Sequence, residues 1–275
     1  MTALDPLIIT VAPNGAYKQA REHPALPLTP QAIAREAARC RDAGAAMLHL
    51  HIRDADGRHS LDVAGYRAAL DAVRAAVGDT LVLQVTSEAA GRYQADEQIA
   101  MVRSLRPEAV SVALRELDQP ALGEAALAAF FGWLQRERVM TQVILYDAAD
   151  LARWQRLQAA GTLPDAPWFL LFVLGRYSRI QTSSPRDLLP FLQAHGGPEP
   201  WALCAFGAAE LACAAAAACF GGHVRVGFEN NLLLKDGTLA PDNAALVAQA
   251  ADAARAIGRP LATADDVRAR FLAPR

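Results

Sequence analysis

The feature that most constrains this chain is an alternation of two kinds of segment. Short aliphatic and β-branched runs, each suited to one buried strand, alternate with longer alanine-rich segments that have the amphipathic period of a helix. This alternation is typical of repeated βα units around a parallel sheet. The eight strand candidates are Leu7–Ala12, Ala46–Ile52, Leu81–Thr86, Ala109–Ala113, Met140–Leu145, Trp168–Leu174, Trp201–Phe206 and His223–Phe228.

Capping residues mark the ends of several helices between these strands. Thr29, followed by proline, predicts the start of the first helix, and Gly44 predicts its end. We expect Ser60 and Gly78 to bracket the second helix, and Ser184, again followed by proline, to open the sixth. These signals place helices between the strand candidates.

Eight βα units without a linker favour a closed α/β barrel, the (β/α)8 TIM barrel, over an open doubly wound sheet. Since such barrels commonly span about 250 residues, we expect residues 1–275 to form one domain. The last segment, about Asn243 to Phe271, predicts the eighth barrel helix and a short helical extension opened by Thr263. The nearly all-apolar helix at about Ala208 to Phe220 should be covered on both sides, by another subunit or by the C-terminal segment.

Charge and hydropathy exclude several kinds of partner. The chain has 27 basic and 29 acidic residues, so it lacks the basic footprint of a protein that binds nucleic acid or an anionic membrane surface. Its longest apolar run, Leu211 to Phe220, is too short to cross a membrane, which takes about 20 residues. The N-terminus has no signal-peptide pattern, which predicts a cytoplasmic protein. The four cysteines lack metal-ligand spacing, and we expect no disulfide.

His49 and His51 form the strongest chemical signal, in the run Leu48-His49-Leu50-His51-Ile52. Alternate residues on a strand share a face, so the two imidazoles can converge on one divalent metal ion. A lone histidine would more often pack in the core or cap a loop. A pair at the end of a barrel strand, where active sites lie, favours metal binding.

Glu229 is the predicted third ligand. It follows the eighth strand, which neighbours the first in a closed barrel, so its carboxylate can reach across the mouth towards the histidines. Two imidazoles and one carboxylate with an open position suit Zn(II), which can polarise a carbonyl group or activate water. The alternative is that Glu229 pairs with Arg225 or Arg53.

Other polar residues follow the strands at equivalent positions, where they could hold polar atoms of a substrate. The substrate-binding candidates are Asn14, Arg53, Thr86 and Ser87. Arg176, after the sixth strand, could meet a phosphate or carboxylate, or could be a solvated loop charge. His223, early in the eighth strand, is expected to be structural.

Several motifs together resemble the β-keto acid cleavage enzymes. They are Thr10-Val-Ala-Pro-Asn-Gly-Ala, Pro27-Leu-Thr-Pro30, His49-Leu-His-Ile-Arg-Asp54, Gly221-Gly-His-Val-Arg-Val-Gly-Phe-Glu229, Gly237-Thr-Leu-Ala-Pro-Asp-Asn243 and Ala262-Thr-Ala-Asp265. The resemblance covers nearly the whole chain. It implies a (β/α)8 barrel, Zn(II) held at His49, His51 and Glu229, and a carbon–carbon bond-cleaving acyltransferase. The substrates would be a 3-oxo acid and acetyl-CoA, and the products acetoacetate and a new acyl-CoA.

The resemblance also implies catalytic residues, and this chain departs from the family pattern at some of them. Arg225 matches a family arginine beside the metal, but Asn230 stands where the family has an aspartate that helps to remove a proton. A neutral amide cannot take that proton. Glu88 is the nearest replacement base by its position at a strand end. Residues 141–147 also lack both glutamates of the family's fifth strand, which argues against a cationic substrate.

Three functions therefore remain open at this point: the family reaction on another keto acid, a metal-dependent aldolase or hydrolase that does not use CoA, and a protein that binds metal and ligand without turnover. The family and the apolar helix both suggest a homo-oligomer, such as a tetramer.

Overall fold

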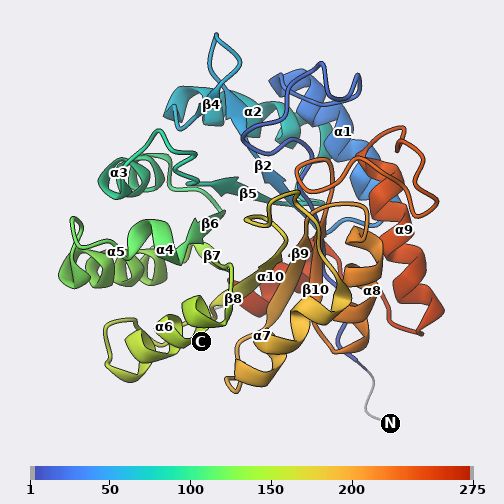
Figure 1. The fold of residues 1–275 in the computed structure, drawn as a ribbon. Helices are drawn as coiled ribbons and strands as arrows, with labels where there is room; N and C mark the ends of the chain where they lie inside the picture. Colours follow the sequence, from blue (N-terminus) through green and yellow to red (C-terminus); the bar gives the residue numbers. More distant parts are fainter. Residues whose placement is uncertain (1–3, 273–275) are drawn as a thin grey trace.

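Eight parallel strands close into a barrel in the computed structural model of this protein, which describes residues 4–272 (Figure 1). Each strand pairs with its neighbours in parallel, and the pairing of β1 with β10 closes the ring. The barrel strands are β1 (Ile9–Val11), β2 (Met47–Leu50), β5 (Val82–Thr86), β6 (Ala109–Ala113), β7 (Met140–Leu145), β8 (Phe169–Leu174), β9 (Trp201–Ala205) and β10 (His223–Val226). The predicted barrel is confirmed, and each predicted strand contains an observed one.

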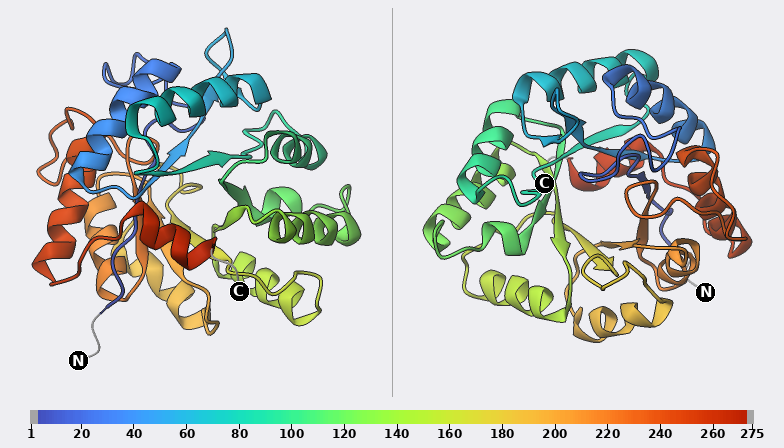
Figure 2. Two further views of the ribbon diagram at one scale, coloured as in Figure 1. Left: turned by 180° about the vertical axis from the view of Figure 1, so that it is seen from behind. Right: turned by 45° about the horizontal axis from the view of Figure 1, so that its top comes forward.

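Helices surround the barrel on its outside, as both views in Figure 2 show. In the described part of the chain they are α1 (Pro30–Ala43), α2 (Val63–Val77), α3 (Ala95–Leu105), α4 (Leu114–Leu117), α5 (Glu124–Arg136), α6 (Ala148–Ala159), η1 (Pro185–Leu188), α7 (Leu189–Ala194), α8 (Glu210–Cys219), α9 (Asn243–Ala256) and α10 (Ala264–Phe271). None of the helices among these residues is both long and apolar enough to cross a membrane.

Most predicted helix ends are found where the capping chemistry placed them. The Thr29 hydroxyl accepts a hydrogen bond from the Ala32 amide, and Gly44 ends α1 with φ 115°, a conformation that favours glycine. Gly78 ends α2, and Ser184 opens η1 with a capping box.

The predicted start of the second helix at Ser60 is wrong. Ser60 lies in the short strand β4 (His59–Ser60), which pairs with β3 (Ile52–Arg53) in a hairpin outside the barrel. Asp62 is the N-cap of α2, and its carboxylate accepts a hydrogen bond from the Gly65 amide at 2.6 Å. The hairpin takes up the residues that directly follow β2, so the helix begins later than the capping pattern indicated.

The apolar helix α8 is covered mainly from within the chain. It packs against β9 and β10, with α9 on one side and η1 on the other, as its place between α7 and α9 in Figure 1 shows. The C-terminal segment thus supplies the predicted cover. The outer end stays open, since the Phe220 side chain is 59% exposed.

The end of the barrel where the strands begin is closed by α10, which crosses it in the left view of Figure 2. Val267 and Phe271 belong to the same apolar cluster as the inward side chains of the strands, and the Phe271 ring lies 4.9 Å from the Phe169 ring. The predicted helical extension is therefore the floor of the barrel. The opposite end, where the strands finish, is the end at which active sites of such barrels lie.

His223 is structural, as expected. Its Nδ1 accepts a hydrogen bond from the Ile8 amide at 3.0 Å, and its ring packs against Phe169 near the floor. Burial, helped by Arg259 and Arg270, lowers the pKa of His223 to about 3 from the ordinary 6.5. The folded protein therefore disfavours the protonated ring.

This histidine should make the protein sensitive to acid. Since its pKa is lower in the folded state, its contribution to stability is complete above pH 6.5 and is lost as the pH falls towards 3. Between pH 6.5 and 5 the loss should be about 1.6 kcal/mol. In urea unfolding at these two pH values, His223→Gln, which can still accept from the Ile8 amide, should lose that much less than the wild type. Equal losses would contradict the assignment.

Candidate metal centre and active site

His49, His51 and Glu229 meet at the open end of the barrel. His49 lies in β2, His51 follows that strand directly, and Glu229 lies in the turn after β10. The two Nε2 atoms are 3.0 Å apart, and the Glu229 Oε2 lies 3.4 Å from that of His49 and 3.3 Å from that of His51. Both imidazoles are buried, and the Glu229 side chain is 11% exposed.

The separations fit a metal ion. Ligand bonds of about 2.0–2.1 Å in a tetrahedral arrangement place the ligand atoms about 3.3 Å apart. The three atoms form a triangle with sides close to that value. Glu229 Oε2 also has no hydrogen-bond donor among the described residues, although it is buried. The cluster could therefore hold a metal ion. Among the described residues, it is the group of histidine and acidic side chains placed closely enough to do so.

The electrostatic state of the cluster agrees with this. Burial lowers the pKa of His49 to about 4, with help from Arg225, and burial also lowers the pKa of His51 well below 6.5. Burial opposes ionisation of Glu229, but Arg225 and the two imidazoles hold its pKa well below the ordinary 4.5. Neutral imidazoles and an ionised carboxylate are the forms in which these groups bind metals.

Gln84 orients one of the histidines. The Nδ1 of His49 lies 2.9 Å from the Gln84 Oε1, so Nδ1 carries the proton and Nε2 keeps its lone pair for a metal. Gln84 in turn donates to Gln142 Oε1 at 3.4 Å. The sequence interpretation missed Gln84. The alternation along β5 could have found it, since Gln84 shares a face with Thr86.

Asn14 was predicted to bind substrate, but both ends of its amide are already bonded to the backbone. Its Nδ2 donates to the Pro27 and His51 carbonyl groups at 3.0 and 2.9 Å, and its Oδ1 accepts from the His51 amide at 3.2 Å. Although Asn14 borders a cavity, these contacts serve to hold His51.

The side chains of Arg53 and Ser87 likewise donate to backbone carbonyl groups. Arg53 donates to the carbonyl groups of Gly15 and Lys18, and so it ties down the loop after β1. The Ser87 hydroxyl donates to the Ser111 carbonyl at 3.2 Å. Neither residue lines the cavities beside the metal cluster. Their contacts do not support the predicted substrate binding, because a sequence does not reveal which way a loop side chain turns.

Two cavities lie beside the three candidate metal ligands, His49, His51 and Glu229. We call them the inner cavity, of about 20 Å³, and the outer cavity, of about 110 Å³. Glu88, Arg176, Phe206 and Glu229 line both. The inner cavity is further lined by His49, Thr86, Ser111, Ala113, Ile144, Tyr146, Val173 and Arg225. The outer cavity is further lined by Asn14, Gly15, Ala16, Tyr17, Lys18, Glu22 and Gln181.

Glu88 stands at the boundary between the two cavities. Its carboxylate pairs with Arg176 at 3.4 Å and lies 3.9 Å from the His51 Nδ1. Burial, together with the negative charge of Glu229, raises the pKa of Glu88 to about 7. Thr86, the predicted neighbour, accepts from the Glu88 amide with its hydroxyl and lines the inner cavity.

Arg225 is buried beside the metal cluster, where the family resemblance implied it would be. Its Nη2 donates to Glu229 Oε1 at 3.0 Å and to the Cys204 sulfur at 3.4 Å. Its Nε and Nη1 have no acceptor among the described residues, although both atoms are buried. Because Arg225 lines the inner cavity, these two groups are available to a bound anion.

Asn230 does not face this chemistry. Its Nδ2 donates to Glu210 Oε1 at 3.2 Å and to the Arg225 carbonyl at 3.1 Å, and its Oδ1 accepts from the Cys204 thiol at 3.1 Å. It lines neither the inner nor the outer cavity. These contacts do not support a catalytic role at position 230, where the family has its aspartate, and no pattern in the sequence indicates the partner Glu210.

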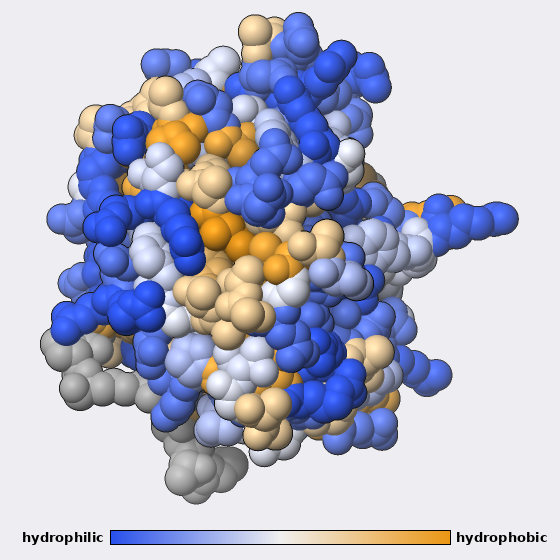
Figure 3. All heavy atoms as spheres, turned by 90° about the vertical axis from the view of Figure 1, so that its left-hand side faces the viewer, coloured by the Kyte–Doolittle hydropathy of each residue, from blue (hydrophilic) through white to orange (hydrophobic). Residues whose placement is uncertain are grey.

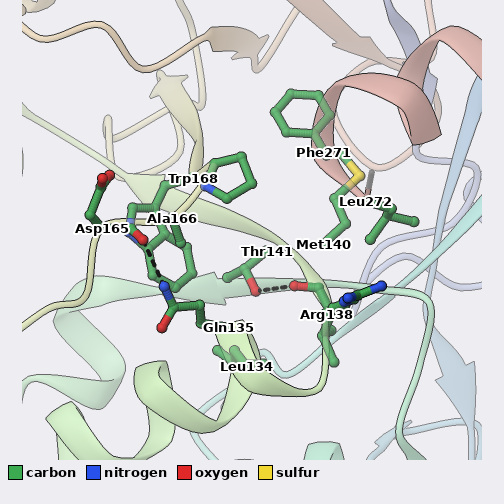
Figure 4. A pocket seen from close by; sticks show the side chains of 12 residues that line it. Leu134, Gln135, Arg138, Met140, Thr141, Asp165, Ala166, Trp168, Phe271 and Leu272 are labelled. Carbon is green, nitrogen blue, oxygen red and sulfur yellow. Dashed lines mark hydrogen bonds between the residues drawn. The ribbon is translucent and has the colours of Figure 1, made fainter. Parts of the chain in front are cut away.

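A larger cavity, of about 190 Å³, lies at the floor of the barrel (Figure 4). Trp168 and Phe271 form much of its wall. The Gln135 amide and the Thr141 hydroxyl both donate to backbone carbonyl groups there. Active sites of such barrels lie at the carboxyl ends of the strands, so size alone does not make this cavity the active site.

The fold and the cluster define a class: a (β/α)8 barrel protein with two histidines and a glutamate, able to hold a metal ion, at the carboxyl ends of its strands. Within that class, the chain belongs to the β-keto acid cleavage enzyme family, whose model matches residues 6–272.

Named relatives agree with this membership. The chain is 32% identical over 271 residues to a 3-keto-5-aminohexanoate cleavage enzyme of Fusobacterium nucleatum, covering 96% of this chain and 97% of the relative. It is 30% identical over 274 residues to a 3-oxoadipate:acetyl-CoA acetyltransferase of Cupriavidus necator, covering 96% and 94%. Among solved structures, apo ObcA matches with a TM-score of 0.71 and 19% identity, over 90% of this chain and 65% of ObcA. That last likeness concerns the fold alone.

Proposed function

We propose that this protein is a zinc-dependent β-keto acid cleavage enzyme. It would convert a 3-oxo acid and acetyl-CoA into acetoacetate and a new acyl-CoA. The observation that carries the proposal is the three-sided cluster of His49, His51 and Glu229 beside the inner cavity. The names of the relatives support the substrate class, because one acts on a keto acid and another is named for acetyl-CoA.

The atoms of this reaction balance without a further reactant. The bond between C2 and C3 of the 3-oxo acid breaks, and C2 forms a new bond to the acetyl carbonyl carbon. The CoA sulfur leaves the acetyl group and bonds to C3. When bound at the cluster, Zn(II) would withdraw charge from the 3-oxo carbonyl. The residues of the chain must then remove and return the C2 proton and hold the carboxylate.

Glu88 is the proposed general base. It reaches both cavities, and its carboxylate pairs with Arg176 at 3.4 Å. A general base works best when its pKa lies near the operating pH, which the pKa of about 7 satisfies. Asn230 lacks both the chemistry and the position for this step.

Arg225 is the proposed anion partner inside the inner cavity. A substrate carboxylate can accept a charge-assisted hydrogen bond from one of its free groups, Nε or Nη1, while Nη2 stays on Glu229. The Ser111 hydroxyl, which is buried without a partner among the described residues, lines the same cavity. Together they favour an acid as substrate.

The far wall of the inner cavity bears on the substrate tail. Ala113, Ile144 and Val173 come from the three consecutive strands β6 to β8, which lie across the ring from β2 and β10. No charged side chain of this wall would meet a cationic tail. We therefore propose a short, uncharged tail on the 3-oxo acid.

Ile144→Glu tests the tail. A buried carboxylate at this wall should lower kcat/KM for 3-oxo acids with an uncharged tail by at least about tenfold, because a charge beside the apolar side chains is costly and repels the substrate carboxylate. Ile144→Val should change the same parameter little. Measurement uses a panel of 3-oxo acids with uncharged and amino-bearing tails. A wild type that prefers the amino-bearing acids would contradict the proposed tail.

The function itself is tested by metal analysis of the purified protein together with acetoacetate formation from a keto-acid panel, with and without acetyl-CoA. Bound zinc and strictly acetyl-CoA-dependent acetoacetate are expected. Turnover without CoA would overturn the acyl transfer, and a wild type that neither contains nor binds metal would overturn the metal centre.

A homo-oligomer stays a prediction. The face seen in Figure 3, on the side where α3, α5 and α6 lie, carries hydrophobic side chains framed by hydrophilic ones. The exposed Phe220 lies beside α8, on another part of the surface. Both could be buried between subunits.

A further inference from the structure

Glu210 is a buried carboxylate that the proposed mechanism does not use. It is the first residue of α8, it is 2% exposed, and it lines neither cavity at the mouth. Three N–H groups donate to it. They belong to the Gly227 backbone at 3.0 Å, the Asn230 side chain at 3.2 Å and the Asn231 side chain at 3.3 Å.

All three donors lie in one turn, residues 227–231, which carries Glu229 at its centre. The backbone of the turn is tight, since the backbone N–H groups of Asn230 and Asn231 both donate to the Gly227 carbonyl. Gly227 itself has φ 135°, and a Cβ there would lie 2.5 Å from the Ala12 carbonyl oxygen. The turn therefore rests directly on the end of β1.

Two contacts fix the height of this turn above the barrel. On one side, the Glu229 amide donates to the Ala12 carbonyl at 3.0 Å. On the other side, Glu210 holds the residues that flank Glu229. A carboxyl group is suited to this, because its two oxygens can accept several hydrogen bonds at once.

We propose that Glu210 is a positioning residue for the metal centre, and that its pairing with Asn230 keeps Glu229 in reach of the two histidines. The proposal rests on the metal site of the proposed function, and it concerns metal affinity rather than proton transfer. It also gives Asn230 a structural role. The amide is the partner that a carboxylate at position 210 requires, since the two side chains meet at 3.2 Å.

Because Asn230 pairs with Glu210, restoring the family aspartate at position 230 alone should weaken metal binding. Asn230→Asp alone would place two carboxylates in one buried contact, where both cannot stay ionised without cost. Glu210→Gln alone would replace one accepting oxygen by an NH2 group. That NH2 group would face one of the three N–H donors of the turn, so a hydrogen bond would be lost. Exchanging both residues, Glu210→Gln with Asn230→Asp, again gives one acid and one amide.

The test measures the Zn(II) dissociation constant of the full chain by competition with a chromophoric chelator. Each single variant should weaken zinc binding by about tenfold or more, and the double variant should lose less than the two single losses combined. Glu108→Gln is the matched control, because Glu108 is a partly buried carboxylate that bonds to Arg268 near the floor of the barrel. It should leave zinc affinity unchanged even if it lowers the unfolding temperature.

Wild-type zinc affinity in Glu210→Gln would overturn the proposal, and so would additive losses in the double variant. Glu210→Asp keeps the carboxyl group but is one methylene too short for all three donors, and it takes the place of Glu210→Gln if that variant does not fold. A wild type that binds zinc but shows no turnover overturns the proposed reaction and leaves the positioning role supported by affinity. A wild type that binds no zinc overturns both.

Discussion

His49→Ala should lose its metal and its activity while keeping its fold. Removing one of three ligands leaves a pair that cannot define the site, and the charge withdrawal supplied by a metal is worth several kcal/mol, or about a thousandfold in rate. Acetoacetate formation and metal content should therefore fall together. Glu229→Gln should behave in the same way, because a neutral amide binds metal far more weakly than a carboxylate.

The control for this experiment is His195→Ala, which removes a partly buried imidazole that is bonded to the Glu199 carbonyl and lines neither cavity at the mouth. That variant should keep metal and activity. Circular dichroism and thermal unfolding report whether each variant is folded. A folded His49→Ala protein with undiminished activity would show that the cluster is not the reaction centre.

Glu88→Gln should separate metal binding from proton transfer. The variant keeps a side chain of the same shape between the two cavities but cannot accept a proton. We expect kcat to fall by about 10² to 10⁴, with metal content close to that of the wild type, because Glu88 lies 3.9 Å from His51 and outside the ligand triangle.

Glu116→Gln is the matched control for the base. Glu116 is also a partly buried glutamate, and it accepts from the Ala89 amide without lining either cavity at the mouth. Its substitution should change kcat little. If Glu88→Gln keeps the wild-type kcat, the base lies elsewhere, and the free hydroxyl and guanidinium groups of the inner cavity become the next residues to test.

The fold and the metal cluster could be predicted from the sequence because both depend on short-range periodicity. Alternation places His49 and His51 on one face, and the order of eight βα units brings the end of β10 next to the start of the ring. Glu229 then follows from its place at the end of that strand. Family motifs agree with each of these steps.

The roles of the surrounding polar residues could not be predicted, because they depend on directions within loops. Asn14, Arg53 and Ser87 all follow strands, as ligand-binding residues do, yet their side chains bond to backbone carbonyl groups. The contact between Asn230 and Glu210 joins a turn to the start of a helix. Neither the helix period nor the strand alternation relates positions 210 and 230.

The closure of the barrel by β1 and β10 has a consequence for how the protein is made. His49 and His51 leave the ribosome early, with β2, whereas Glu229 emerges only after β10, the last barrel strand. A growing chain can therefore form most of the sheet and still lack a complete metal site. A metal ion held by all three residues can be bound only once β10 has paired with β1.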